Sequence, residues 1–300
     1  MITFIVQGPL NNNLAKSLPI YQKYGNIILS CWDSDPVKYL SEIGSNVKYT
    51  LVTRPYPHKE EIDNISSIIS KDHHGGILYQ MLTIINALSF IKKSSSQQQE
   101  RDYIIKVRSD EYFENLDTFI HSLYEGKFVS GNMFCLHSMY WKYHISDQIF
   151  GCDADDFRGM FNQINDILNT LFSKKEQQPI KLKEYIEYIS EQVDCIHPEQ
   201  MIAISYCVQK GIQPSTNYEN IMRDNFSIVS MKSMGKFVVS YKNPDNLRLY
   251  VSDTNNEYLW INSISEMLEL PRSYPQKFID QEDMMFHFAI GKLLYCRGEW

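Results

Sequence analysis

Short apolar segments alternate with amphipathic ones along the first 110 residues of the chain. Three of the amphipathic segments carry apolar residues at helical spacing: residues 14–24, 36–44 and 75–93. The apolar segments are rich in β-branched and aromatic residues, as strands are, and cover residues 2–6, 26–32, 46–57 and 103–108. Strands that alternate with helices pair in parallel through right-handed crossovers. The pattern therefore predicts an α/β fold with a mostly parallel central sheet flanked by helices.

The second half of the chain has a mixed and more helical pattern. The helix predicted at 197–211 is marked by Pro198 near its start and Gly211 at its end. Other predicted elements are helices at 117–126 and 278–295, a strand-to-helix segment at 141–161, and strands at 128–136, 226–231 and 236–241. No repeat or linker-like segment interrupts the chain, so we expect one domain over residues 1–300, with halves 1–115 and 116–300.

Composition limits the classes of binding partner and the cellular compartment that we expect. The net charge is −7, and a nucleic-acid groove concentrates Lys and Arg, so we expect no nucleic-acid partner. A single phosphate-bearing small molecule needs only one or two cations and a metal. The six cysteines form no CxxC pair, which favours reduced thiols in a cytoplasmic protein over a zinc site. The N-terminus lacks a signal-peptide pattern, and no apolar run reaches the roughly 18 residues of a membrane span.

Polar residues follow each predicted strand of the first half. They are Gln7 with Gly8, Trp32 with Asp33, Arg54, and Arg108 to Asp110. Ligands of open α/β sheets bind at the carboxyl ends of the strands. We therefore expect these residues to border a ligand crevice, with the small Gly8 allowing the backbone to approach the ligand.

The fourth strand leads directly into charged residues, in the segment YIIKVRSDEYFENL. Asp110 and Glu111 are adjacent acids, and hard cations such as Mg²⁺ bind carboxylates together with the phosphates of a substrate. Lys106 and Arg108 are close enough in the chain to meet a phosphate. Two interpretations stay open, because Asp110 would equally serve to cap the next helix and Glu111 to face water.

Four short motifs occur in order along the first half: FIVQGPL, IILSCWDSD, GGILYQMLTIINAL and YIIKVRSDEYF. Together they resemble the WavE-type lipopolysaccharide-synthesis glycosyltransferases, whose strands end in Gln-Gly-Pro, Ser-x-Trp and Lys-x-Arg-[Ser/Thr]-Asp. The resemblance covers residues 2–115 and continues more loosely through HISDQIFGCDADDF and HPEQMIAISYCVQKG. It implies a GT-A fold in which residues 1–115 bind a nucleotide sugar and residues 116–300 face the acceptor.

The same resemblance implies a metal-assisted glycosyltransferase of polysaccharide biosynthesis. It would move a sugar from a nucleoside-diphosphate sugar to a hydroxyl of a glycan or other acceptor, with Mn²⁺ or Mg²⁺. Asp110 is then the expected metal ligand, and Glu111 and His287 are further candidates, although Ser109-Asp110-Glu111 stands where the family has Asp-x-Asp. The expected donor site comprises Gln7, Gly8, Pro9, Trp32, Arg54, Gln80, Lys106, Arg108, Ser109 and Asp110. Two of these residues have an alternative interpretation: Trp32 would fill the core, and Gln80 would be an ordinary polar residue of a helix.

An inverting transferase also needs a carboxylate to take the proton of the acceptor hydroxyl. Asp147 precedes an apolar turn, and we prefer it to Glu199 as the candidate base. Glu199 falls in the first turn of a predicted helix, where its charge would also stabilise the helix dipole. A retaining enzyme needs no such base, so both stereochemical outcomes stay open.

Two other functions compete with sugar transfer. A nucleotidyltransferase acting on a sugar phosphate uses a similar sheet, but it normally has a Gly-rich loop with Arg or Lys after its first strand. The segment from Gln7 to Asn11 has one glycine, and the first cation after it is Lys16. A non-catalytic nucleotide-sugar-binding protein on the same fold is the third interpretation. The oligomeric state is left open.

Overall fold

A computed structural model of the 300-residue chain gives the fold. The structure describes residues 1–56, 74–91, 101–131, 133–134, 143, 145–172, 198–213, 218–229, 234, 236–239, 247–249 and 260–261. The predicted helix at 278–295 and the candidate metal ligand His287 lie outside these residues.

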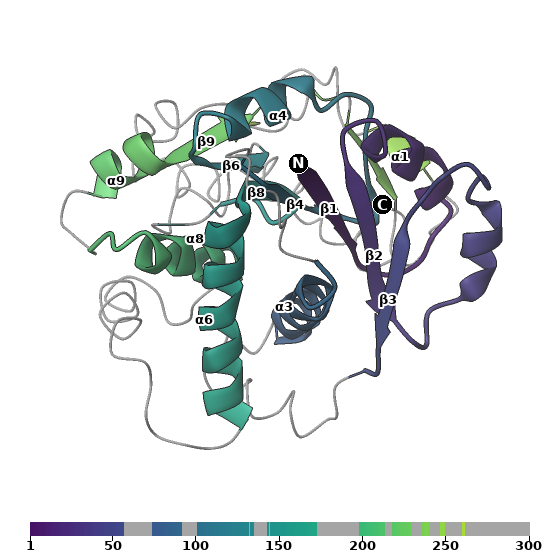
Figure 1. The fold of residues 1–300 in the computed structure, drawn as a ribbon, viewed down its shortest axis with the longest axis horizontal. Coiled ribbons are helices and arrows are strands. Elements are labelled where there is room, and N and C mark those ends of the chain that lie inside the picture. The colour runs from purple at the N-terminus through teal and green to yellow at the C-terminus, as the bar shows by residue number, and fades with distance from the viewer. Residues whose placement is uncertain are drawn as a thin grey trace, which may run out of the picture.

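A seven-stranded sheet forms the centre of the molecule, in the order β3-β2-β1-β4-β8-β6-β9 (Figure 1). Its strands are β1 (Ile2–Gln7), β2 (Asn26–Trp32), β3 (Thr50–Arg54), β4 (Tyr103–Arg108), β6 (Phe128–Gly131), β8 (Ile149–Asp153) and β9 (Phe226–Val229). The strands β3, β2, β1 and β4 are parallel, and β6 pairs in parallel with β9. The strand β8 runs antiparallel to both of its neighbours, β4 and β6. The predicted α/β fold with a mostly parallel sheet is therefore confirmed.

Short strands extend this framework on either side. They are β5 (Glu111–Phe113), β10 (Lys236–Val239) and β11 (Leu247–Leu249) in one small sheet, and β7 (Met133–Phe134) and β12 (Trp260–Ile261) in another. The predicted strand at 128–136 is thus divided into β6 and β7. The short helix predicted at residues 36–44 is the 3₁₀ helix η1 (Val37–Glu42).

Helices cover both faces of the central sheet (Figure 1). One face packs on α1 (Leu14–Tyr21) and α4 (Asp117–Leu123). The other face packs on α3 (His74–Leu88), α6 (Ala154–Phe172), α8 (Pro198–Gln209) and α9 (Tyr218–Asn225). Strand residues alternate between the two layers, so that Phe4 and Val6 face α1 while Ile5 faces α3. Both faces are buried, which explains why the strands are apolar throughout.

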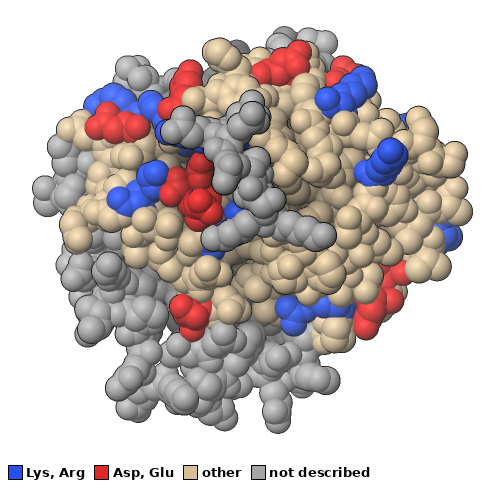
Figure 2. Space-filling view, in the orientation of Figure 1, with Lys and Arg blue, Asp and Glu red and all other residues tan. Residues whose placement is uncertain are grey.

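Charged side chains of both signs lie on the molecular face shown in Figure 2, with uncharged residues between most of them. No helix in the described part of the chain is both long enough and apolar enough to cross a membrane.

Candidate active site

The strand order reverses between β1 and β4: β2 and β3 were added on one side of β1, and β4 is added on the other. The strand β1 lies between β2 and β4, and α1 and α3 cover opposite faces. Gln7 at the end of β1 is paired with Arg108 at the end of β4. A reversal of this kind opens a crevice at the carboxyl ends of the two strands, where ligands of open α/β sheets bind. Of the four strand ends predicted to converge, those of β1 and β4 lie side by side.

A tight turn follows β1 and is held against the end of β4. Gly8 has φ of +130°, which a residue with a side chain rarely adopts. The Ser109 hydroxyl donates to the carbonyl of Pro9 at 2.8 Å, and the Ser109 N–H donates to the carbonyl of Gln7 at 2.8 Å. The Gly8 N–H donates to Ser30 on β2 at 3.2 Å. The backbone of the turn is therefore fixed at the carboxyl edge of β1, between β2 and β4.

We expect Gly8→Ala to destabilise the protein by roughly 2–4 kcal/mol, because it combines backbone strain with steric overlap. A Cβ at this position would lie 2.6 Å from the Ser109 hydroxyl oxygen. Gly211→Ala is the matched control, since Gly211 has φ of +68° but no atom within 4 Å of the added Cβ; it should cost only about 1 kcal/mol. Urea unfolding of both variants measures the difference, and equal losses would contradict the close packing at Gly8.

Arg108 binds Asp110 at the carboxyl end of β4. Its Nε and Nη2 atoms donate to the two carboxylate oxygens of Asp110 at 2.9 and 2.8 Å. Its Nη1 atom lies 3.6 Å from Oδ2 of Asp147. This bidentate geometry is typical of a guanidinium paired with a carboxylate, and the pair is largely shielded from water. The helix α4 begins at Asp117 with Leu116 as its N-cap, so the alternative that Asp110 caps this helix is wrong.

Asp147 reaches the same edge because β8 is antiparallel to β4. The amino end of an antiparallel strand lies at the carboxyl end of its neighbours, and Asp147 stands two residues before β8. Its Oδ2 accepts a hydrogen bond from Nε2 of Gln80, on α3, at 2.5 Å. Its backbone carbonyl accepts one from Nζ of Lys106, which is fully buried. Lys106 therefore contacts the backbone of Asp147 and has no exposed surface.

A second carboxylate comes from α8. Glu199 lies in the first turn of this helix and is partly buried. Burial and the charge of Asp147 raise the pKa of Glu199 to about 8, and Lys106 and Arg108 oppose this rise. Burial also lowers the pKa of the Lys106 ammonium to about 8, partly offset by Asp147. Glu199 is thus held in its protonated form near neutral pH.

The candidate metal ligands do not form a closed protein site. The carboxylate of Asp110 is bound by Arg108, whereas the charge of Glu111, on β5, contributes to raising the pKa of Tyr21 on α1. No three His, Cys, Asp or Glu side chains are placed to hold an ion anywhere in the described residues. Of the two candidate ligands in the described residues, Asp110 is the one whose carboxylate pairs with Arg108 at the end of β4. A donor set based on this carboxylate fits Mg²⁺ or Mn²⁺ only if the ion takes most of its ligands from substrate phosphates and water.

Aromatic side chains flank the crevice at the ends of β2 and β3. Trp32 is only 5% exposed and packs against Tyr56 and Tyr79, with ring centroids 4.7 and 5.6 Å away. Arg54 lies over the Trp32 ring at 5.9 Å and donates to the carbonyl of Leu82 at 3.2 Å. Trp32 therefore fills the core, as its alternative interpretation held. Tyr56, which is 49% exposed, presents the accessible ring and was not identified from the sequence.

Asp35 is another residue that the sequence reasoning missed. Its Oδ2 accepts a hydrogen bond from the Trp32 N–H at 3.0 Å, and its carboxylate also accepts one from the Leu10 N–H. Burial raises the pKa of this carboxyl. Asp35 thus joins the loop after β1 to the loop after β2, and the acidic DSD segment was the only signal of it.

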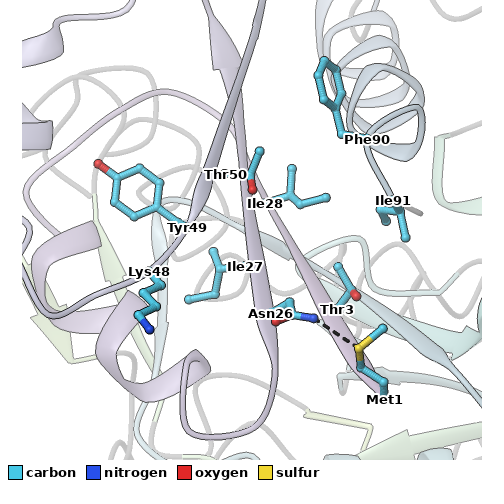
Figure 3. A pocket seen from close by; sticks show the side chains of 10 residues that line it. All are labelled: Met1, Thr3, Asn26, Ile27, Ile28, Lys48, Tyr49, Thr50, Phe90 and Ile91. Carbon is cyan, nitrogen blue, oxygen red and sulfur yellow. Dashed lines mark hydrogen bonds between the residues drawn. The ribbon is translucent and has the colours of Figure 1, made fainter. Parts of the chain in front are cut away.

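A pocket of about 320 Å³ lies at the opposite edge of the sheet, around the amino ends of β1, β2 and β3 (Figure 3). Its lining includes Asn26, Lys48, Tyr49 and Phe90, and none of the predicted site residues. The side chain of Asn26 donates to the Met1 sulfur at 3.2 Å within it. The lining contains no carboxylate side chain to act as acid or base, so we place the active site at the carboxyl edge instead.

No family model and no curated protein sequence matches this chain. Among solved structures, it is similar to the galactosyltransferase LgtC in complex with donor and acceptor sugar analogues, at 7% identity and a TM-score of 0.37, covering 68% of this chain and 70% of that one. Mouse xyloside xylosyltransferase 1 is 5% identical, with a TM-score of 0.38 and coverage of 73% and 86%. The 4-diphosphocytidyl-2C-methyl-D-erythritol synthase of Anaerococcus prevotii is 11% identical, with a TM-score of 0.35 and coverage of 69% and 98%. Similarities at this level say nothing about the chemistry of the site.

Proposed function

We propose that this chain is a glycosyltransferase that moves a sugar from a nucleoside-diphosphate sugar to a hydroxyl of a glycan acceptor. The observation that carries the proposal is the convergence of Arg108, Asp110, Asp147 and Glu199 beside the Gly8 turn, at the reversal point between β1 and β4. The resemblance of residues 2–115 to WavE-type glycosyltransferases supports it independently. Under this proposal the product is a surface polysaccharide or related glycan, made in the cytoplasm.

The donor half of the site must offset the charge that grows on the leaving diphosphate. Arg108 stands at the end of β4, where a diphosphate lying across the crevice would meet its guanidinium. Gly8 lets the backbone of the turn approach the nucleoside, with Gln7 and Pro9 on either side of it. Tyr56 offers an exposed ring within reach of the ends of β2 and β3, in place of the buried Trp32.

The metal of this reaction would be held by Asp110 together with the donor. When bound, Mg²⁺ or Mn²⁺ would neutralise charge on the diphosphate as it leaves. Arg108 pairs with the carboxylate of Asp110, which keeps the buried charge compensated. We therefore expect metal binding to depend on the nucleotide, because one protein carboxylate is a weak site alone.

The acceptor half contains the proposed base. Asp147 takes the proton of the acceptor hydroxyl while the hydroxyl oxygen bonds to the anomeric carbon and the bond from that carbon to the diphosphate breaks. Gln80 and Arg108 orient the carboxylate of Asp147 from two sides. Glu199 stays protonated and leaves the negative charge on Asp147. This assignment corresponds to inversion at the anomeric carbon.

A thermal-shift comparison tests the donor site. UDP-, GDP- or CDP-sugar with Mn²⁺ should stabilise the protein by about 2–3 kcal/mol at a hundredfold excess over the dissociation constant, and Mn²⁺ alone should not. Asp110→Asn should abolish the nucleotide-dependent effect of the metal. Asp155→Asn is the control, since Asp155 is an exposed carboxylate at the opposite edge, in the first turn of α6. An Asp110→Asn protein that responds like the native one would remove the metal assignment.

The released product separates sugar transfer from nucleotidyl transfer. A glycosyltransferase releases a nucleoside diphosphate from the sugar nucleotide, whereas a nucleotidyltransferase releases pyrophosphate from a nucleoside triphosphate and a sugar phosphate. The loop from Gln7 to Asn13 contains no Lys or Arg to hold a triphosphate. Stabilisation by a nucleoside triphosphate together with pyrophosphate release would overturn the proposal. Binding with no release of either product would favour the non-catalytic alternative.

A further inference from the structure

Lys106 is the one charged residue of β4 that the proposed reaction does not use. It is fully buried, and its Nζ atom donates to the backbone carbonyl of Asp147 and lies 5.4 Å from the centroid of the Phe150 ring. Phe150 is its register partner on β8. A buried ammonium loses the hydration that an exposed lysine keeps, and this loss is tolerated only with compensating partners. One of its partners here is the backbone of the proposed base itself.

We infer that Lys106 is a positioning residue for Asp147, and that it does not bind the donor's diphosphate. The inference rests on the proposed function for the role of Asp147. The lysine donates to the backbone carbonyl of Asp147, while Gln80 and Arg108 contact its carboxylate. The backbone and the side chain of one residue are thus held by three others from two different elements.

The strand geometry explains why Arg108 and Lys106 have different roles. Side chains two residues apart on a strand point to the same face, so Ile104, Lys106 and Arg108 all face the layer of α3 and α8. Each step of two residues advances about 6.6 Å along the strand. Arg108 is at the end of β4 and reaches the crevice, whereas Lys106 lies one step further inside the sheet.

The charged groups around Lys106 favour an ammonium held in place within the protein over one that binds a phosphate. The acidic groups of Asp147, Asp110 and Glu199 favour the charged form of Lys106. The charge of Arg108 disfavours it. Gln80 of α3 adds a neutral side chain on the same carboxylate. Replacing the ammonium would leave Asp147 with less positive charge nearby, which disfavours its ionised form. Loss of Lys106 should therefore alter both the position and the basicity of Asp147.

Chemical labelling of the native protein tests the burial directly and needs no activity. Reductive methylation with formaldehyde and a borane reductant, read by peptide mass spectrometry, should leave Lys106 unmodified with or without UDP or GDP and Mn²⁺. Lys16 and Lys23 are exposed and should be modified in both conditions. If Lys106 is methylated in the free protein and protected by nucleotide, it is a phosphate ligand and the inference is wrong. A failure of the proposed function leaves this result unaffected.

Turnover of Lys106→Met and Lys106→Arg provides the second test. Lys106→Met should release nucleoside diphosphate roughly 10- to 100-fold more slowly, because a displaced base reacts poorly, yet keep the donor-induced thermal shift. The acidic limb of its rate–pH profile should move to higher pH, and Lys106→Arg should restore part of the rate. Loss of the donor-induced shift with an unmoved profile would overturn the inference. Should Lys106→Met fail to fold, the labelling result decides between the two roles.

Discussion

Replacing Asp147 with asparagine is expected to lower the rate of sugar transfer by roughly 10²- to 10⁴-fold, the range typical of a lost general base. Asparagine has the shape of aspartate but cannot accept the acceptor's proton. Donor binding should persist, because the Gly8 turn, Arg108 and Asp110 are untouched. The measurement is release of nucleoside diphosphate at saturating donor and acceptor, with the donor-induced thermal shift recorded on the same samples.

Glu199→Gln is the matched control for this prediction. Glutamine resembles the protonated carboxyl group that the burial of Glu199 and the charge of Asp147 favour. We therefore expect a loss of less than about tenfold at neutral pH. A large loss for Glu199→Gln with a small one for Asp147→Asn would exchange their roles. Full activity in both variants would show that no carboxylate of this pair acts as base, which would contradict the inverting mechanism.

The carboxyl edge of the first four strands could be predicted from the sequence because its signals are local. Each buried parallel strand is a short apolar run, and the polar residue that ends it marks the edge. Gln7, Gly8 and Arg108 were placed in this way, and the pairing of β1 with β4 brings them together. The positions of Asp147 and Glu199 depend on β8 and α8, and their candidacy came from resemblance and not from periodicity.

Orientation of the side chains could not be predicted in the same way. Lys106 was expected at a phosphate, but whether a strand residue faces the crevice or the layer beneath depends on how far it stands from the strand end. The exposure of Trp32 and Tyr56 was equally beyond local signals, because both rings pack against Tyr79, which comes from α3 far along the chain. The roles proposed for Glu111 and Asp110 stay predictions. In the structure the carboxylate of Asp110 pairs with Arg108, whereas the backbone carbonyl of Glu111 accepts a hydrogen bond from Asn13.

Glu199 also makes the stability of the protein depend on pH. Its pKa is about 8 in the folded protein, against an ordinary value of 4.5. Between these values the unfolded chain has lost the proton that the folded protein keeps, so the free energy of unfolding falls as pH rises. Lys106 has the opposite effect at higher pH, because its pKa falls from 10.5 to about 8 on folding. There the unfolded chain retains the proton, and the free energy of unfolding rises with pH.

The two residues together predict a minimum of stability near pH 8, and Glu199→Gln should remove the falling limb. The variant should match the native protein near pH 4.5 and exceed it near pH 8 by an amount on the order of a few kcal/mol, or several degrees in Tm. Thermal unfolding from pH 4.5 to 9 measures this difference. Glu219→Gln is the control, because Glu219 is an exposed carboxylate in the first turn of α9 and should leave the profile unchanged. A Tm difference independent of pH would mean that Glu199 ionises normally, and the division of roles between the two carboxylates would then lose its electrostatic basis.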